Sequence, residues 1–351
     1  MAASLKSLYR KVQPLFVPAS SSSNPRDPNG FQKVAAASAL FPTVDPAVDG
    51  PDCNKDCASC TIQYPARFRI DESDQLYGQV NGWTTHVLVA TGKTDWVKHV
   101  VDEQGSVMEA LGKGGVKPKN GDLMLSASNI PPPEEYYAAS PGRQPTTVLV
   151  LPSFTLVDNV TPQDVPELIS AFVDTGPTTT SPMIPSTGPN PAQEFENASG
   201  VAHDIASAAP ALPRPSSDSN LTARRCPHQY LILLCSQKTR DVRCGQSAPL
   251  LRRELERHLR PLGLYRDLDD DRPGGVGIYF ISHVGGHKYS ANMMIYRKHD
   301  VGEASQAIWL ARIRPEDCEA IVKYTVLQGK VVKPLTQLRG GFDRERGVVS
   351  W

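Results

Sequence analysis

A proline-rich segment divides the 351-residue chain into two stretches that can each build a core. Residues 176–220 contain eight of the 31 prolines, among serine, threonine, glycine and alanine and with hardly any large apolar residue. Because proline fixes its backbone and cannot donate a hydrogen bond, such a segment favours extended polyproline conformations over packed structure. The sequence therefore predicts a tail at 1–50, a domain at 51–175, a disordered linker at 176–225, a second domain at 226–335 and a tail at 336–351.

Both stretches show the same order of expected elements: strand, helix, strand, loop, further strand, and a helix that begins with proline. In the first stretch we expect strands at 86–90, 122–127 and 147–151 and helices at 96–111 and from 161. In the second we expect strands at 229–234, 276–281, 293–296 and 307–311 and helices at 248–259 and after 317. The repetition predicts an internal duplication in an α/β protein. Its element order is that of a thioredoxin-like fold, so two thioredoxin-like halves joined by a Pro/Ser/Thr-rich linker are expected.

Charge and hydropathy exclude two classes of partner. The chain carries 37 basic and 37 acidic residues, so no net charge attracts it to nucleic acid or to an anionic membrane. No apolar run approaches the roughly 18 residues that a membrane-spanning helix needs. The chain is therefore expected to be soluble, with no nucleic-acid partner and no membrane span.

The first 26 residues leave the cellular location open between two compartments. They hold four basic residues, six serines and no acidic residue, which is the composition of a mitochondrial presequence and also of an ordinary disordered tail. No secretory signal is visible. We expect a cytoplasmic location, with a mitochondrial one as the alternative.

Two cysteines and two histidines of the second stretch form a candidate metal site. Cys235 ends an expected strand, Cys244 lies nine positions further on, and His283 and His287 follow the strand at 276–281, so all four are expected in loops. Clustered cysteines in a reducing compartment indicate metal or redox chemistry before disulfides. Two thiolates and two imidazoles suit a structural zinc ion, whose cysteines are usually closer in sequence, or a [2Fe-2S] cluster of the Rieske ligand type.

Several motifs resemble the sucrase/ferredoxin-like family, and in particular its fungal members of the actin-patches-distal and altered-inheritance-of-mitochondria type. The resemblance lies in residues 235–245 and 282–292, and in the N-terminal stretches 41–45, 56–60 and 85–93. The family is similar to thioredoxin-like ferredoxins, and its members are thought to hold a [2Fe-2S] cluster through a Cys-x8-Cys pair and a His-x3-His pair. The resemblance thus implies a thioredoxin-like ferredoxin domain in the C-terminal half, with Cys235, Cys244, His283 and His287 as ligands.

Charge arithmetic indicates what such a centre would do. Two thiolates and two neutral imidazoles leave an oxidised [2Fe-2S] core neutral, whereas four thiolates make it doubly negative, so an electron is added more easily. A coordinated imidazole keeps a second ring nitrogen that exchanges a proton, which couples reduction to pH. We therefore expect an electron-transfer or redox-sensing protein with an unidentified redox partner protein. A structural-zinc interaction protein and a thiol oxidoreductase are the alternatives, and no glycosidase or nucleophile-elbow pattern indicates an enzyme.

Three further cysteines and the terminal tryptophan raise separate hypotheses. Cys53, Cys57 and Cys60 have the spacing of a radical-SAM motif without the barrel context, which leaves a second metal site, a thiol redox pair or ordinary cysteines. Val349, Ser350 and Trp351 resemble the terminal tripeptide by which some proteins are presented to the cytosolic iron-sulfur assembly machinery.

Overall fold

The computed structural model describes residues 29–183, 212–217, 219–300 and 302–351. The presequence-like segment and the centre of the expected linker lie outside the described residues. In chain order the strands are β1 (Gln32–Lys33), β2 (Thr85–Ala90), β3 (Leu123–Ser128), β4 (Thr146–Leu151), β5 (Thr155–Val160), β6 (Thr222–Arg225), β7 (Tyr230–Cys235), β8 (Tyr265–Arg266), β9 (Val276–Ile281), β10 (Met293–Lys298), β11 (Ala304–Leu310), β12 (Leu338–Asp343) and β13 (Val348–Val349). The α-helices are α1 (Ala37–Leu40), α2 (Pro46–Asp49), α3 (Val107–Lys113), α4 (Glu135–Ala138), α5 (Val165–Leu168), α6 (Val242–Leu259), α7 (Cys318–Ala320) and α8 (Pro334–Gln337), and π-helical turns at Ile169–Val173 and Ile321–Val326 extend α5 and α7.

The strands form one mixed sheet that contains two units with the same internal order. The sheet runs β1-β13-β12-β11-β10-β7-β9-β3-β2-β4-β5-β6, and β8 pairs with β9. In the first unit β2 pairs in parallel with β3 and antiparallel with β4, and β4 pairs antiparallel with β5. In the second unit β7 pairs in parallel with β9 and antiparallel with β10, and β10 pairs antiparallel with β11. The α/β class expected from the sequence is therefore confirmed, and the element order repeats in the two units.

The last helix of each unit begins with the same local chemistry. In the first unit the Asp164 carboxylate accepts a hydrogen bond from the Thr161 amide at 2.9 Å, and Pro162 occupies the first turn. In the second unit Asp317 accepts from the Arg314 amide at 2.7 Å, again with proline in the first turn. Proline is tolerated there because the first turn of a helix has no internal acceptor for its missing N–H. These positions made both helices predictable from the sequence.

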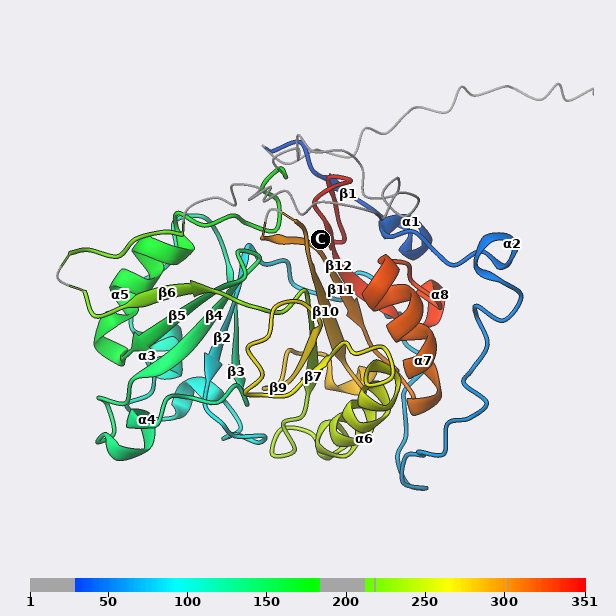
Figure 1. Ribbon diagram of the computed structural model, residues 1–351, viewed down its shortest axis with the longest axis horizontal. Coiled ribbons are helices and arrows are strands. Elements are labelled where there is room, and N and C mark those ends of the chain that lie inside the picture. Colours follow the sequence, from blue (N-terminus) through cyan, green and yellow to red (C-terminus); the bar gives the residue numbers. More distant parts are fainter. Residues whose placement is uncertain (1–28, 184–211, 218, 301) are drawn as a thin grey trace, which may run out of the picture.

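The two units join edge to edge, and their inner faces share a core. β3 pairs antiparallel with β9, and beside this pair the Phe280 amide donates to the side-chain oxygen of Asn129 at 2.7 Å. Along β2, Val87 faces the helices of its own unit, whereas Leu88 belongs to a central hydrophobic cluster with Leu231 of β7. Figure 1 shows the resulting layers, with α3 and α5 outside one half of the sheet and α6 and α7 outside the other.

Two helices differ from the sequence prediction. The helix expected at 96–111 is confined to α3 and a short 3₁₀ turn, because Gly105 adopts a φ of 69° and Ser106 caps a new start by accepting from the Glu109 amide. The helix expected at 248–259 begins six residues earlier, where the Asp241 side chain accepts from the Arg243 amide at 2.9 Å. Because α6 begins early, Cys244 lies in its first turn and not in a loop.

The expected tails and linker are partly structured. Residues 336–351 were expected to be a tail, but they contribute β12 and β13, and Phe342 is fully buried. Within 29–50, Leu40 and Phe41 are buried, and the Leu40 carbonyl accepts from Arg346 at 2.7 Å. The end of the expected linker forms β6, which pairs with β5. Leu40, Phe41 and Phe342 belong to the hydrophobic clusters of the fold, so residues 29–50 and 336–351 are not tails, and residues 222–225 are a strand of the first unit and not linker.

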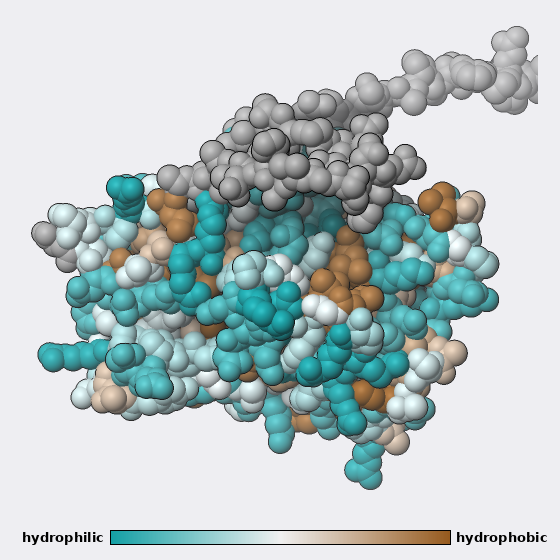
Figure 2. Space-filling model, viewed as in Figure 1, coloured by the Kyte–Doolittle hydropathy of each residue, from teal (hydrophilic) through white to brown (hydrophobic). Residues whose placement is uncertain are grey.

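The surface drawn in Figure 2 is largely hydrophilic, with separate brown patches between charged and polar residues. Among the described residues no helix is long and apolar enough to cross a membrane.

Candidate metal centre

The carboxyl ends of β7 and β9 bring the predicted ligands together. Cys235 is the last residue of β7 and pairs in register with Ile281, the last residue of β9. Because the two strands are parallel neighbours, the loop that carries His283 begins at the same edge of the sheet. Helix α6 starts there as well and supplies Cys244. Ligand atoms of Cys235, Cys244 and His283 all lie within 4.8 Å of one another, and Cys235 Sγ is 3.7 Å from His283 Nδ1.

The fourth predicted ligand, His287, lies in the same loop at the start of a 3₁₀ turn (His287–Tyr289). The structure describes its backbone and not its side chain, so its role as a ligand stays a prediction. Gly285 and Gly286 between the two histidines have φ values of 82° and 61°, which favour glycine. A Cβ on Gly286 would come within 2.3 Å of the Arg339 guanidinium. The histidine loop therefore needs glycine at this position.

The two thiols are buried and interact with each other. Cys244 hydrogen-bonds Cys235 and so lowers the pKa of Cys235, against the effect of burial. The backbone amides of Val284 and Gln237 lower the same pKa further. The same contact with Cys235, together with burial, raises the pKa of Cys244. One thiolate is thus stabilised before any metal binds, and the amides that surround it suit a metal-bound sulfur.

Arg339 of β12 hydrogen-bonds the loop that carries the two histidines, and the sequence analysis did not predict this role. Its guanidinium is buried and donates to the Gly285 carbonyl at 2.9 Å, to the side-chain oxygen of Asn292 at 3.0 Å and to the Gln79 carbonyl at 3.1 Å. It also lies 4.3 Å from the ring centroid of Trp309. Burial lowers the pKa of Arg339 to about 10, with an opposing effect from Cys235. The only signal of this role in the sequence is an arginine placed directly before two glycines.

The basic residues that flank the ligands in sequence have other partners. Arg243 pairs with Asp241 at 2.8 Å, Lys288 pairs with Asp74, and Arg240 contacts His99. The charges of Arg243 and Lys288 are therefore compensated by neighbouring carboxylates, whereas Arg240 lies beside an imidazole.

Backbone carbonyls of the first unit hydrogen-bond the loop that follows Cys235. Gln237 is buried, donates to the Val97 carbonyl at 2.6 Å and accepts from the His283 amide at 2.8 Å. Ser236 donates to the Thr94 carbonyl at 2.7 Å. The candidate centre is thus positioned by residues of both units, although its ligands come from the second.

One side of the centre opens to solvent. Cys235 and Cys244 are buried, whereas His283 is partly exposed and lines a cleft of about 500 Å³ together with Trp83, Gly285 and Lys288. The end of the chain packs near this cleft: Val349 and Ser350 are buried, and the Trp351 ring lies 4.5 Å from Trp83. The terminal tripeptide is therefore part of the fold and not a free extension.

The cysteines at 53, 57 and 60 do not form one group. All seven cysteines are free. Cys53 is buried, and the Cys60 thiol donates to the Ile62 carbonyl at 3.6 Å. Cys57 instead lies within 4.8 Å of ligand atoms of His258 and Glu319, two residues that sequence reasoning missed because they come from α6 and α7.

Comparison with known proteins places these features in a family. A family model described as sucrase/ferredoxin-like matches residues 76–340. Actin patches distal protein 1 of Saccharomyces cerevisiae is 39% identical over 106 residues, which is 30% of this chain and 32% of that protein. Altered inheritance of mitochondria protein 32 of Clavispora lusitaniae is 38% identical over 108 residues (31% and 34%), and its namesake in Debaryomyces hansenii is 40% identical over 105 residues (30% and 34%).

The matched region spans about a third of the length of these curated relatives. No solved structure matches the chain. The family model, in contrast, covers both structural units and all four predicted ligands. The chain therefore belongs to the sucrase/ferredoxin-like family.

Proposed function

We propose that this protein is a one-electron carrier or redox sensor that holds a [2Fe-2S] cluster through Cys235, Cys244, His283 and His287. The observation that carries the proposal is the convergence of two buried thiols and one imidazole within 4.8 Å, at the edge of two parallel strands. Cysteine sulfurs and histidine ring nitrogens are also the ligand atoms of Rieske-type clusters. We also propose that the two repeated units are thioredoxin-like halves, the C-terminal one a ferredoxin domain.

The surroundings of the ligands support this assignment. Bound, the cluster would accept and return a single electron. Arg339 supplies a buried positive charge on the side of the histidine loop, and the amides of Val284 and Gln237 point at Cys235. Positive charge and amide donors near the sulfurs both favour the more negative, reduced state.

Exposure indicates where electrons and protons would pass. Of the three ligands whose side chains are described, His283 alone is partly exposed. The ring nitrogen of His283 that is not used for ligation can exchange a proton with solvent, so reduction coupled to protonation is part of the proposal. A redox partner protein would approach on this side, since the thiols are covered.

The test is spectroscopic. Protein purified without oxygen should be coloured, contain two irons per chain and give an EPR signal after reduction, as expected for this cluster type. His283→Ala and His287→Ala should each change that signal, whereas His299→Ala, a histidine outside the site, should not. A colourless protein with zinc bound by Cys235 and Cys244 would instead identify a structural-zinc protein.

The location and maturation of the protein are also proposals. We propose the cytoplasm as the location and the cytosolic iron-sulfur assembly machinery as a partner that recognises Trp351. Because Ser350 is buried and the Trp351 ring packs against Trp83, recognition would precede folding of this strand. Cell fractionation and cluster occupancy of a Trp351 deletion in cells test these points.

A further inference from the structure

A second cluster of metal-ligating side chains lies where the last turn of α6 meets α7. Cys57 Sγ is 4.0 Å from His258 Nε2, and the Glu319 carboxylate lies within 4.8 Å of both. The three residues come from distant parts of the chain: an irregular segment, the last turn of α6, and α7. Cys57 is buried, His258 is partly buried and Glu319 is exposed.

Two charged side chains, Glu254 and Arg257, contact the residues of this cluster. Glu254 is fully buried on α6, and both of its oxygens accept from Arg257 Nε at 3.1 Å. Arg257 Nη2 also lies 3.5 Å from Cys57 Sγ and 3.0 Å from His258 Nε2. Glu254 Oε1 lies 3.2 Å from the same nitrogen, so Nε2 has both a donor and an acceptor within hydrogen-bond distance. A metal bound at Nε2 would replace these two contacts, and the Arg257 side chain, which is 42% exposed, would turn towards solvent.

We propose that Cys57, His258 and Glu319 bind a zinc ion. Thiolate, imidazole and carboxylate are the three ligand types that zinc combines, and a thiolate disfavours magnesium and calcium. In a tetrahedral zinc site the ligand atoms lie about 3.5 Å from one another. Rotations of the side chains would bring the three ligand atoms to this distance, and Glu319 is free to rotate because it is exposed. The fourth position is taken by water from an adjoining cleft of about 530 Å³ that Cys57 and Glu319 line.

Charge supports the same assignment. One thiolate, one carboxylate and a neutral imidazole balance the two charges of zinc, while Arg257 balances the buried Glu254. The resulting cluster carries no unpaired buried charge, which would be unfavourable.

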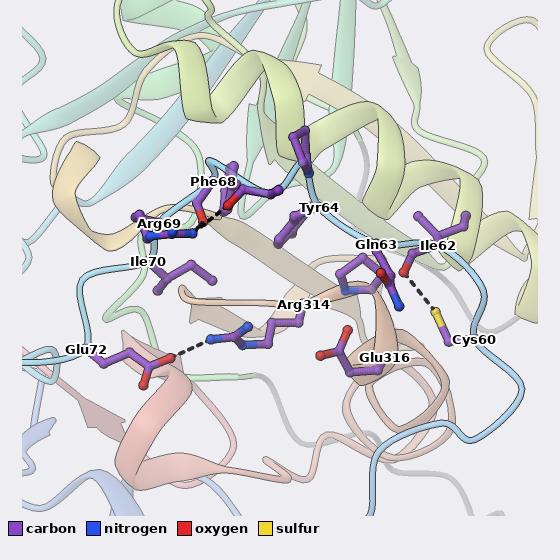
Figure 3. Close-up of a pocket in the computed structure, with 13 residues that line it drawn as sticks. Cys60, Ile62, Gln63, Tyr64, Phe68, Arg69, Ile70, Glu72, Arg314 and Glu316 are labelled. Atoms are coloured by element: carbon purple, nitrogen blue, oxygen red, sulfur yellow. Dashed lines mark hydrogen bonds and ion pairs between the residues drawn. The ribbon is translucent and has the colours of Figure 1, made fainter.

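The neighbouring Cys60 does not join this set. Its thiol is directed at the Ile62 carbonyl, as Figure 3 shows, and burial raises its pKa to about 11. The pocket of about 670 Å³ beside it contains Glu72 and Arg314, which pair with each other at 2.7 Å. This pocket is also lined by Glu316, but none of its lining residues belongs to the group of ligand atoms formed by Cys57, His258 and Glu319.

The zinc ion would fix a segment that has little structure of its own. Residues 50–84 contain no helix or strand, yet they run across α6 and α7. Their attachments include the Cys57 amide to the Glu316 carbonyl at 2.9 Å, Tyr64 to the Ile313 carbonyl at 2.7 Å and Lys333 to Asp56 at 2.6 Å. A metal that joins Cys57 to both helices would add a further attachment to these hydrogen bonds.

Zinc and iron contents of the purified full chain test the proposal. Protein from zinc-supplemented medium should contain about one zinc per chain, in line with a single three-residue site. Cys57→Ser, His258→Ala and Glu319→Gln should each lower zinc at least about fivefold without changing iron. His299→Ala is the matched histidine control, and Glu319→Gln replaces an exposed side chain, so its loss of zinc cannot result from unfolding.

Cys235→Ser separates this site from the proposed cluster. It should abolish iron and leave zinc unchanged. Chelation of zinc should also speed tryptic cleavage at Lys55, Arg67 and Arg69, and should do so in wild type and not in Glu319→Gln. Absence of zinc from the wild-type protein, retention of zinc in Cys57→Ser, or loss of zinc in Cys235→Ser would each overturn the proposal.

Discussion

His86 lies at the contact between the two units, and its titration should make the fold sensitive to acid. Its Nε2 contacts Ser126 of its own unit at 2.9 Å, and its Nδ1 contacts the Tyr296 hydroxyl of the other unit at 3.0 Å. The side chain is fully buried, and burial lowers its pKa to about 3. An unfolded histidine has a pKa of about 6.5, so the unfolded chain binds a proton that the folded protein excludes.

The sign and size of the effect follow from this difference. Because the folded-state pKa is depressed, the stabilisation is present above pH 6.5 and is lost as the pH falls towards 3. Between pH 7.5 and pH 5, His86 should decrease the free energy of unfolding by about 2 kcal/mol. His228 is also buried, with a pKa lowered to about 4, and should contribute a similar decrease of about 2 kcal/mol.

The substitution His86→Gln isolates the first contribution, since glutamine keeps a donor and an acceptor but does not titrate. Urea unfolding followed by tryptophan fluorescence at pH 7.5, 6 and 5 gives the free energies. The wild type should lose about 2 kcal/mol more than the variant over this range. His299→Gln, at a partly exposed histidine, is the control. Equal losses in wild type and His86→Gln would refute the reasoning, whatever the absolute stability of the two proteins.

Three further predictions concern the candidate metal centre and the end of the chain. Arg339→Gln should lower the reduction potential of the bound cluster because a buried positive charge favours the added electron, and an EPR-monitored redox titration should detect the shift; an unchanged midpoint with full iron content would contradict this role. Gln237→Ala leaves the His283 amide and the Val97 carbonyl without their buried partner, so unfolding should need about 1–3 kcal/mol less and cluster absorbance should decay faster on storage; equal decay would argue against bracing. Trp351→Ala removes a partly buried ring from Trp83 and should cost about 1–3 kcal/mol in thermal unfolding, whereas an unchanged Tm would show that the contact contributes little.

Elements with a continuous apolar pattern could be predicted from the sequence. The strand expected at 276–281 is β9, residue for residue, because it is buried on both faces and preceded by two glycines. The start of α6 could not be predicted in the same way, because proline at 249 is more common in a first turn than in a helix interior. The Asp241 cap competes with that preference and moves the helix start six residues earlier, which brings Cys244 into the helix.

The predicted ligands of the candidate centre could be identified from the sequence for a physical reason. The residues that hold the ligand loops in place could not. Cys235 and His283 follow strands that the element order already made parallel neighbours, so their proximity could be inferred. Arg339 reaches the site from β12, in a segment that was expected to be a tail. His258 and Cys57 are 201 positions apart and meet through an irregular segment with no periodicity. Contacts of this kind depend on packing between elements, which no local pattern records.

The position of the centre also bears on why two units occur in one chain. The loop after Cys235 is held by Ser236 and Gln237 through carbonyls of the first unit, at Thr94 and Val97. The sheet is continuous across β3 and β9, and the apolar faces behind both strands share one cluster. Without the first unit, the second unit would expose this hydrophobic cluster and would lose both hydrogen bonds that hold its ligand loop. The first unit provides none of the predicted cluster ligands but hydrogen-bonds the loop that follows Cys235. The boundary expected at 225 therefore separates two halves of one core.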